Sequence, residues 1–473
     1  MLKADKDQYD AVIIGAGMSG LVCGCYLAKA GMKVLIAEQH HKPGGYCSSF
    51  KRKGFTFDAA AHSFGGYREG GIVNQVFKDI EADKRIKVNR FDPTDTIITP
   101  DYKVSFRTDL NKSIEEFQST FPDENNNIKR FFSFVVNPDP NSFSKIRSWS
   151  FKNLLDKYFD DNRLKFILAA PLLGIGGLPP SLMSAFIGVK LFSEFLLDGG
   201  YYPEGGMQAL PDALTEGFKK LGGELRLSCL VKKIKVRDNK VMGVVLEKSL
   251  FIPSRYVISN CDAKQTFLKL IGKGNIEEEF YSTLKRMKPS LSNFIVYLGL
   301  DGIFESLPKY GTSLWYFSHY NLEKAYQAAQ EGDIKSFGVY MLRVLHNKPT
   351  VTAIIPAPYK NKSYWRNNKS EILNSLVNKI ENHSIPHLSK HIVYKDAATP
   401  HTLHRYTLNY RGASFGWAGT PSQLAVTGFK KPSFLKGLYL TGHWTTQGLG
   451  ISGVCYVGHD TAKIILKKGN LIR

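Results

Sequence analysis

Two glycine-rich segments at opposite ends of this chain of 473 residues constrain its fold more than any other feature. The first covers residues 9–20 and is followed by Glu38 and by the pair Gly44-Gly45. The second covers residues 437–453. A domain that binds a nicotinamide dinucleotide needs only the first segment. A chain that folds its far end back over its first domain to cover a flavin needs both.

The first segment has the order of strand, turn and helix that a dinucleotide-binding motif requires. Residues 11–14 are an apolar run typical of a buried parallel strand, and a helix is predicted over residues 18–30. In the turn, Gly15 permits the tight bend and Gly17 lets the backbone approach a pyrophosphate. Gly20 lets the helix pack closely on the strand. The positive end of that helix then faces the phosphates.

An acidic residue ends the second predicted strand, residues 33–38. The carboxylate of Glu38 is placed to accept hydrogen bonds from both ribose hydroxyls of a dinucleotide. A negative charge there disfavours a 2′-phosphate, so we expect no NADP-type ligand at this site. Glycine-rich turns are common, but a turn between a strand and a helix with the acid at this distance is a strong indication. A turn without a ligand is the alternative.

The chain carries a large excess of positive charge. Its 63 lysines and arginines against 42 aspartates and glutamates give a net charge of +21, which attracts anionic surfaces. Nucleic acid and an anionic lipid leaflet are both candidate partners. The chain has no zinc-finger spacing and no basic heptad region, so we expect lipid rather than nucleic acid. A solvated basic surface without a partner is the alternative.

The cysteines and the hydropathy pattern bear on the compartment. The six cysteines are scattered through apolar segments and none forms C-x-x-C, which indicates reduced, packed thiols and a cytoplasmic protein. Residues 1–8 are polar and charged, so no signal peptide is expected. No stretch of 18 or more apolar residues lacks a charge, so no transmembrane helix is expected. The 12 histidines show no helical H-x-x-x-H pattern, and no metal site is predicted.

The pattern of strands predicts one discontinuous α/β domain with two insertions. The domain, Rossmann-like, is predicted to combine residues 1–75, 200–262 and 395–473. In its middle part we expect strands over 225–231, 233–237, 241–247 and 256–260, with a hairpin turn at Asp238-Asn239. Residues 76–199 are expected to form a helical lid or membrane-facing element and part of the substrate domain. Residues 263–394 are expected to form the rest of that α+β substrate-binding domain.

The most apolar region spans residues 163–197. It predicts either a pair of core helices under the lid or a surface that dips into one leaflet of a bilayer and opens a tunnel for an apolar substrate. Lys190 and Glu194 are four residues apart and are predicted to pair on one exposed helix face.

Four blocks of the sequence resemble the bacterial-type phytoene desaturase superfamily of FAD-dependent oxidoreductases. That superfamily includes carotenoid desaturases, carotenoid cis–trans isomerases and retinol saturases. The blocks are residues 9–20, 44–58, 202–206 with Val231, and 437–453. The resemblance implies the fold of two-dinucleotide-binding-domain flavoproteins, with FAD as the cofactor. It also implies that Val231 meets the adenine through its backbone.

The resemblance further assigns a set of cofactor-binding residues. The glycine turn of the last block, with Gly442, would lie beside the flavin ring, and the helix after Gly450 would point its N–H groups at the flavin's pyrimidine edge. The predicted cofactor-binding residues are Gly15, Gly17, Ser19, Gly20, Glu38, Gly44, Gly45, Val231, Gly442, His443, Gly450 and Ile451.

The chain departs from the family pattern at several positions. His443 stands where many relatives have an aspartate, and Tyr46 where many have arginine or serine. Asp58-Ala-Ala60 replaces the Asp-x-Gly of many desaturases, and the following His62 leans toward the saturase-like branch. The reaction within the family therefore stays open among desaturation, saturation and isomerisation.

Two residues are candidates for catalysis. His62 is predicted to be an acid or a contact of the flavin, and a hydrogen-bonded core histidine is the alternative. Arg405 is predicted to neutralise a phosphate or to orient a substrate terminus, and a structural ion pair is the alternative. Phe415 and Trp417 are predicted either to wall a polyene or to pack in the core.

The expected function is FAD-dependent chemistry on the C–C double bonds of a carotenoid, retinoid or similar polyisoprenoid at a membrane surface. A quinone or oxygen is expected as the electron acceptor, since the chain shows no second nicotinamide site. A flavin amine oxidase is one alternative, and it needs an aromatic cage and usually a lysine near the flavin. A non-catalytic binder of prenyl groups is another, but it predicts loss of the phosphate-binding glycines, and Gly15, Gly17 and Gly20 are all present.

Overall fold

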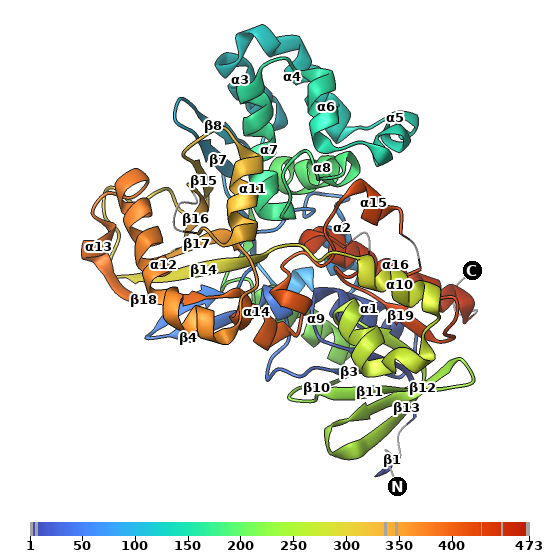
Figure 1. Ribbon diagram of the computed structural model, residues 1–473. Helices are drawn as coiled ribbons and strands as arrows, with labels where there is room; N and C mark the ends of the chain where they lie inside the picture. Colours follow the sequence, from blue (N-terminus) through green and yellow to red (C-terminus); the bar gives the residue numbers. More distant parts are fainter. Residues whose placement is uncertain are drawn as a thin grey trace.

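The computed structural model describes residues 3–4, 8–334, 338–345, 349–426, 428–445 and 448–469. Two sheets dominate it, one of eight strands and one of seven. Figure 1 shows the eight-stranded sheet in the lower part of the view near the N-terminus, the seven-stranded sheet beside α12, and a group of helices above both. The molecule thus has the predicted α/β fold with a second α+β unit and a helical cap.

The eight-stranded sheet draws on segments far apart in the sequence. Its strands are β1 (Lys3–Ala4), β2 (Tyr9–Ile14), β3 (Val34–Ala37), β10 (Glu224–Arg226), β11 (Val231–Arg237), β12 (Lys240–Leu246), β13 (Leu250–Ser259) and β19 (Leu438–Leu440). β10, β3, β2 and the second half of β13 run parallel, and β19 pairs with the same half of β13. β11, β12 and the first half of β13 form an antiparallel ribbon. The long strand β13 therefore joins both parts.

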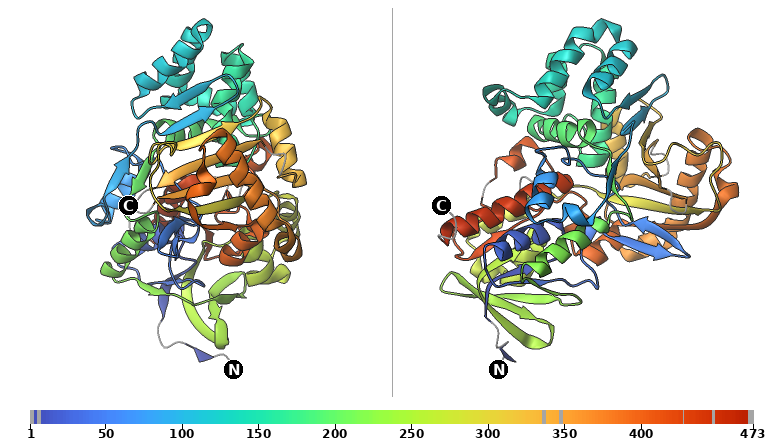
Figure 2. Two further views of the ribbon diagram at one scale, coloured as in Figure 1. Left: turned by 90° about the vertical axis from the view of Figure 1, so that its left-hand side faces the viewer. Right: turned by 180° about the vertical axis from the view of Figure 1, so that it is seen from behind.

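Helices from the two ends of the chain pack against each other on one face of this sheet. α1 (Met18–Lys29) lies along α16 (Gly450–Lys468), as the rear view in Figure 2 also shows. The approach is close, because a Cβ atom on Gly458 of α16 would lie 2.6 Å from the carbonyl oxygen of Ser19. α9 (Ala209–Lys220) and α2 (Ile72–Asp79) complete the layer. The two glycine-rich segments thereby meet in space.

One predicted strand in this region is wrong. Residues 225–231 do not form a single strand, since β10 ends at Arg226 and β11 starts at Val231. The chain turns between them, with Ser228 at a φ of 49°, because the N–H groups of Ser228 and Cys229 donate to the carbonyls of His40 and Glu38. The hairpin at Asp238-Asn239 is confirmed, and both residues have positive φ, as a type I′ turn requires.

The seven-stranded sheet combines both predicted insertions. Its order is β18-β14-β17-β16-β15-β7-β8. Its strands are β7 (Asp95–Ile98), β8 (Lys103–Phe106), β14 (Ser292–Leu300), β15 (Ser313–Phe317), β16 (Val339–Leu345), β17 (Thr350–Ala357) and β18 (Ile392–Ala398). β14 and β17 are buried along their whole length, because apolar residues fill most of both strands. A hairpin of β4 (Ser49–Arg52) and β5 (Phe55–Asp58) packs beside β17.

Helices cover this sheet and rise above it. They are α3 (Leu110–Thr120), α4 (Asn125–Val136), α5 (Pro140–Lys145), α6 (Phe151–Tyr158), α7 (Asn162–Gly176), α8 (Ala185–Leu191), α11 (Leu322–Glu331), α12 (Lys362–His383), α13 (Leu388–His391), α14 (Pro400–Thr407) and α15 (Pro421–Leu424). α10 (Glu278–Arg286) instead packs in the core beside the eight-stranded sheet. No helix in the described part of the chain combines the length and the apolar character needed to cross a bilayer. All six cysteines are free, as predicted.

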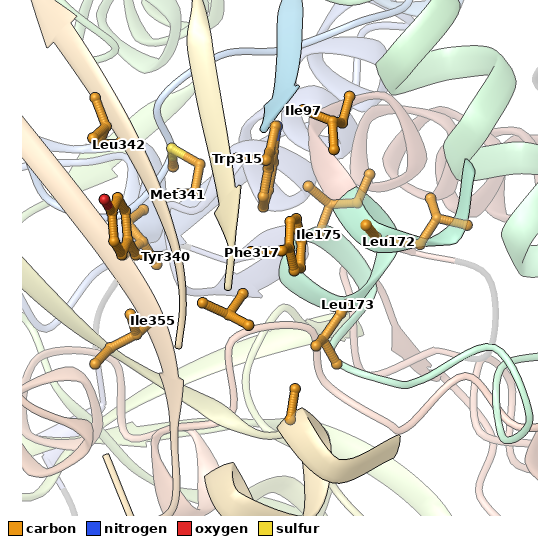
Figure 3. Packing of buried hydrophobic residues seen from close by; sticks show 14 of the residues in the cluster. Ile97, Leu172, Leu173, Ile175, Trp315, Phe317, Tyr340, Met341, Leu342 and Ile355 are labelled. Atoms are coloured by element: carbon orange, nitrogen blue, oxygen red, sulfur yellow. The ribbon is translucent and has the colours of Figure 1, made fainter. Parts of the chain in front are cut away.

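The most apolar region of the sequence lies inside the molecule. It forms α7 and α8, and on α7 the side chains of Ile167, Leu168, Leu172 and Leu173 are at most 1% exposed. Figure 3 shows α7 facing the aromatic side chains of β15. This arrangement is the predicted pair of core helices and not a face exposed to a bilayer.

The predicted pair of Lys190 and Glu194 is not formed. After Leu191 the helix widens into a π-helical turn, Phe192–Leu197, which rotates Glu194 away from Lys190. Glu194 instead bonds Arg68, and Lys190 lies over the ring of Phe143.

Candidate functional site

The two glycine turns face each other across the side chain of Asn260, which follows β13. Its amide nitrogen donates to the carbonyl of Gly15, at 3.2 Å. A Cβ atom on Gly17 would lie 2.9 Å from that nitrogen, and a Cβ atom on Gly442 would lie 2.5 Å from the amide oxygen. The N-terminal and C-terminal turns can therefore approach only because these positions are glycines.

Sequence reasoning did not single out Asn260. The signal that could have found it is its place, since it is a polar residue directly after a buried parallel strand, where ligand sites of α/β sheets lie. The hydroxyl groups of Ser19 and Thr441 make a second link between the turns, at 2.6 Å.

The other predicted glycines pack around the first turn. A Cβ atom on Gly20 would lie 2.3 Å from the carbonyl oxygen of Gly15, which is the close contact of helix and strand that the motif needs. Gly44 donates from its N–H to Ala16 at 2.9 Å and has a φ of 120°. Gly45 lies against Gly17.

Glu38 lies at the end of β3 with its carboxylate held by the backbone. Its two oxygens accept hydrogen bonds from the N–H groups of Ala16, at 2.7 Å, and His40, at 2.8 Å. Burial raises the pKa of this carboxyl, and the backbone N–H groups oppose that rise. Its backbone carbonyl binds the N–H of Cys229, which brings the nearby Val231 to the same end of the site.

Two helices point uncapped N-termini at the site. The N-cap residues, Gly17 of α1 and Leu449 of α16, make no side-chain hydrogen bond to the first turn, although such caps are common in helices. The free N–H groups and the helix dipole favour a negative group at each end. Gly450 begins α16 with a φ of 66°. We call the two glycine turns, with Glu38 and the starts of α1 and α16, the glycine cradle. The cradle fits a dinucleotide whose pyrophosphate lies at α1 and whose ring, able to take up negative charge, lies at α16.

One continuous cavity extends from this cradle into the space between α7 and the seven-stranded sheet. Its cradle end is lined by Gly15, Gly17, Ser19, Glu38, Gly44, Gly45, Val231, Asn260, Gly442, His443, Gly450 and Ile451. Its other end is apolar and aromatic, with Leu173, Gly174, Ile175, Leu191, Phe195, Trp315, Phe317, Tyr340, Met341, Ile354 and Phe415. Two of the predicted residues do not line this cavity. Gly20 packs against the turn at Gly15, and Arg405 lines a second cavity.

The apolar end of the cavity has a fixed wall. The indole nitrogen of Trp315 donates to the buried carboxylate of Asp95 at 2.7 Å. The ring lies on the backbone of α7, because a Cβ atom on Gly174 would be 2.2 Å from it. Figure 3 shows Trp315 and Phe317 beside Ile175. Burial raises the pKa of Asp95 to about 6.

Among the described residues, two histidines line the cavity, His62 and His443. Nε2 of His62 is buried and has no hydrogen-bond partner among the described residues. Burial, reinforced by the charge of Arg343, lowers the pKa of His62 to about 3. Burial lowers the pKa of His443 to about 4, and its ring stacks near Tyr46. Both rings are therefore neutral at neutral pH, which favours contact with a bound group over a role of His62 as an imidazolium acid.

Arg405 faces a different cavity. It is exposed, lies over the ring of Tyr406, and makes no ion pair among the described residues. The second cavity borders the first at Glu38 and Tyr46, and its wall is basic, with His40, His41, Lys42, Lys51, Arg52, Lys369 and Arg405. Lys369 is paired with Asp396.

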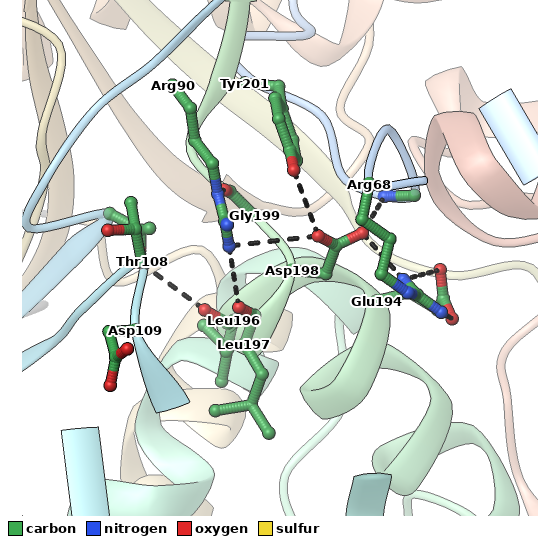
Figure 4. Close-up of polar contacts among 12 residues, drawn as sticks. Arg68, Arg90, Thr108, Asp109, Glu194, Leu196, Leu197, Asp198, Gly199 and Tyr201 are labelled. Carbon is green, nitrogen blue, oxygen red and sulfur yellow. Dashed lines mark hydrogen bonds and ion pairs between the residues drawn. The ribbon is translucent and has the colours of Figure 1, made fainter. Parts of the chain in front are cut away.

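A cluster of charged groups holds the loop that carries His62. Arg68 bonds Glu194 at 3.0 Å and Asp198 at 2.6 Å, and Asp198 also accepts from the N–H of Gly66 and the hydroxyl of Tyr201. Figure 4 shows these contacts converging on Asp198. They fix the loop against the π-helical turn whose Phe195 lines the cavity.

In the described part of the chain, no group of three or more His, Cys, Asp or Glu side chains is placed to hold a metal ion.

Trp417 lies away from the cavity. Its ring is buried between Phe429 and Trp444, and its nitrogen donates to the carbonyl of Trp444. It packs in the core, whereas Phe415 lines the cavity.

Comparison with known proteins points to one family. Residues 18–466 match the family described as flavin containing amine oxidoreductase. The chain is 25% identical to a chloroplastic prolycopene isomerase of Daucus carota, over 95% of this chain and 79% of the relative. It is 23% identical to a lycopene-forming phytoene desaturase of Pseudescherichia vulneris, over 96% of this chain and 99% of the relative. It is 22% identical to an all-trans-retinol 13,14-reductase of Danio rerio, over 92% of this chain and 82% of the relative.

Solved structures share the fold of the whole chain. An oxidoreductase from Methanosarcina mazei superposes with a TM-score of 0.69 at 17% identity, over 96% of this chain and 99% of that one. Putrescine oxidase superposes with a TM-score of 0.66 at 15% identity, over 98% of this chain and 99% of that one. These likenesses establish the fold of the chain.

Proposed function

Since the chain belongs to the family of flavin-containing amine oxidoreductases, with FAD as its cofactor, we propose that it acts on the C–C double bonds of a long apolar polyisoprenoid. The substrate class is a carotenoid, a retinoid or a related polyene. The reaction is a desaturation, a saturation or a cis–trans isomerisation. The three relatives named above catalyse one reaction of each kind, by their names.

The observation that carries this proposal is the continuous cavity that joins the glycine cradle to the apolar, aromatic end described above, which we call the aromatic chamber. When bound, FAD supplies a two-electron acceptor or donor for hydride exchange with carbon. The chain supplies the positions. The uncapped start of α1 would hold the pyrophosphate, Glu38 the ribose, and the start of α16 the polar edge of the ring. Whatever enters the chamber then lies between that ring and the wall of Trp315 and Phe317.

The chamber suits an apolar substrate better than an amine. Its walls are aliphatic and aromatic, and no lysine lies among the described residues that line the cavity. Such walls exclude water from the reacting carbon. His62 contributes a neutral ring with an unpartnered Nε2 that can hydrogen-bond a bound group. We propose a quinone or oxygen as the electron acceptor for a net oxidation.

The test is anaerobic incubation of the FAD-loaded protein with a panel of polyenes in liposomes, followed by product chromatography and flavin absorbance. Bleaching of the flavin with a more conjugated product identifies a desaturase. A gain of two hydrogens from pre-reduced protein identifies a saturase. A change of geometry without a change of mass, seen only with pre-reduced protein, identifies an isomerase. If no polyene reacts and an amine panel bleaches the flavin, the chain is an amine oxidase.

We also propose that the chain contacts an anionic membrane peripherally through Lys51, Arg52 and Arg405, which we call the basic rim. These side chains are exposed at the edge of the second cavity, and Tyr406, 46% exposed, lies beside Arg405. Basic residues near an anionic leaflet contribute about 1 kcal/mol each. An exposed tyrosine next to them suits the interface of a bilayer.

The double substitution Lys51→Gln and Arg52→Gln is expected to weaken binding to vesicles that contain anionic lipid by about 30-fold, from the loss of about 2 kcal/mol. Co-sedimentation at fixed ionic strength measures it. The matched control removes Lys129 and Arg130, an exposed Lys-Arg pair on α4. A loss confined to the control would place the contact on the helical cap and overturn the basic rim.

A further inference from the structure

Arg343 is the most unusual charged residue in the molecule. It lies on β16 in an otherwise apolar strand, and its side chain is 0% exposed. Its Nε and Nη2 atoms have no hydrogen-bond partner among the described residues. A buried guanidinium without a carboxylate partner is costly. Such a group calls for an explanation beyond packing.

Arg343 interacts electrostatically with Asp58 and Asp95, but within the described residues it forms no hydrogen-bonded ion pair with either acid. Its guanidinium lies over the rings of Phe91 and Tyr202, at 5.6 and 5.2 Å. The carboxylate of Asp58 is already held by the hydroxyl of Tyr202, and that of Asp95 by the indole of Trp315.

The hydrogen bond that Arg343 does make leads to the cavity. Its Nη1 donates to the backbone carbonyl of His62. The imidazole of the same residue lines the cavity with its Nε2 unpartnered and lies edge-on to Phe195. The cluster around Asp198 holds this loop at Gly66 and Arg68, and backbone bonds to Ser48 and Tyr46 hold it at Ala59 and Ala61. Between these two anchored parts, Arg343 fixes the carbonyl of His62 itself.

We propose that Arg343 is a positioning residue that fixes His62 on the cavity wall and keeps its Nε2 turned toward the bound polyene and flavin. This deepens the proposed function and rests on it. The aromatic sandwich and the bond to the His62 carbonyl set the place of the guanidinium. Its positive charge, set behind the ring, disfavours protonation of the imidazole. His62 therefore serves as a neutral hydrogen-bond acceptor.

A double-mutant cycle tests the proposal with the FAD-loaded protein and whichever polyene reacts. Arg343→Met is expected to lower kcat by 10- to 100-fold, because misplacing a reacting group by about 1 Å has effects of that order. His62→Gln should lower it at least as much. The double variant should be no slower than His62→Gln alone, since Arg343 acts through His62. Arg343→Lys, which keeps the charge, should recover part of the loss.

A second readout does not depend on turnover. In substrate-free protein labelled with ¹⁵N-histidine, the signals of His62, assigned by their loss in His62→Gln, should report one fixed neutral tautomer. In Arg343→Met they should shift or broaden as the ring gains freedom, and the titration midpoint should rise by about one unit. If no polyene is turned over but these signals change, the positioning role holds and the proposed function fails.

The matched control is Arg85→Met. Arg85 has a side chain that is 15% exposed and also donates to backbone carbonyls, those of Ile80 and Glu81. These bonds and its ion pair with Glu216 lie outside the cluster around Asp198. Its loss should leave the His62 signals unchanged and combine additively with His62→Gln. The proposal is overturned if Arg343→Met and His62→Gln are additive in kcat, or if the His62 signals in folded Arg343→Met match those of the unaltered protein.

Discussion

Replacing Gly20 by alanine is expected to weaken FAD binding by about 100-fold. The new Cβ atom would lie 2.3 Å from the carbonyl oxygen of Gly15 and 2.9 Å from the amide nitrogen of Asn260. The first of these atoms is backbone, so α1 must move away from the turn that binds the pyrophosphate. Overpacking of this kind costs up to about 3 kcal/mol, which corresponds to about 100-fold in a dissociation constant. Equilibrium dialysis of the refolded apoprotein against FAD measures it.

The control for this prediction is Gly274→Ala, the same chemical change where a Cβ atom would meet nothing within 4 Å and the backbone φ is not positive. It should retain FAD like the unaltered protein. Far-UV circular dichroism of both variants separates loss of the cofactor from loss of the fold. A folded Gly20→Ala protein with an unchanged FAD dissociation constant would contradict the placement of the pyrophosphate against α1.

Replacing Ile354 by tryptophan is expected to lower kcat/KM for the polyene by 100-fold or more and to leave the FAD content unchanged. Ile354 lies on β17 of the seven-stranded sheet and lines the apolar end of the cavity, whereas the glycine cradle follows strands of the other sheet. The larger ring would occupy the space that the proposed substrate needs. A substrate held about 1 Å from its productive position reacts on the order of 100-fold more slowly. Product chromatography and the flavin absorbance of one sample give both quantities.

Ile303→Trp is the matched control, because the same substitution there falls on a side chain that is 72% exposed. It should react at the rate of the unaltered protein. A loss of FAD in Ile354→Trp that parallels the loss of rate would mean that the aromatic chamber belongs to the cofactor. The polyene proposal would then lose its main support.

The cofactor cradle could be predicted from the sequence because its signals are local. The order of strand, glycine turn and helix is written in residues 9–30, and the acid follows within the next strand. The structure places Gly15, Gly17, Glu38 and the glycines of residues 442–450 on one cavity. No long-range contact had to be known to name them.

Asn260 and Arg343 could not be found in the same way. Asn260 matters because two turns from opposite ends of the chain meet on its amide group. Arg343 matters because a strand of the second sheet places it behind His62, 281 residues away along the chain. A lone arginine in a buried strand is a visible signal, but its partner depends on tertiary structure.

The pairing of strands in the seven-stranded sheet could not be predicted from local sequence patterns either. The sequence separates residues 76–199 from 263–394, yet β7 of the first pairs with β15 of the second. Residues 225–231 are apolar enough to predict a strand, but hydrogen bonds to His40 and Glu38 bend them into a turn. In both cases the deciding partner comes from a distant part of the chain.

The meeting of α1 and α16 has a consequence for biogenesis. Residues 15–45 of the cradle are synthesised well before its opposing wall at Gly442 and Gly450. A nascent chain that lacks residues 438–468 therefore has half of the binding site, and stable uptake of the flavin must await their synthesis. Until β19 docks beside β13, that sheet keeps an open edge that can pair with other chains. The segment that completes the binding site is thus also the one that closes this edge.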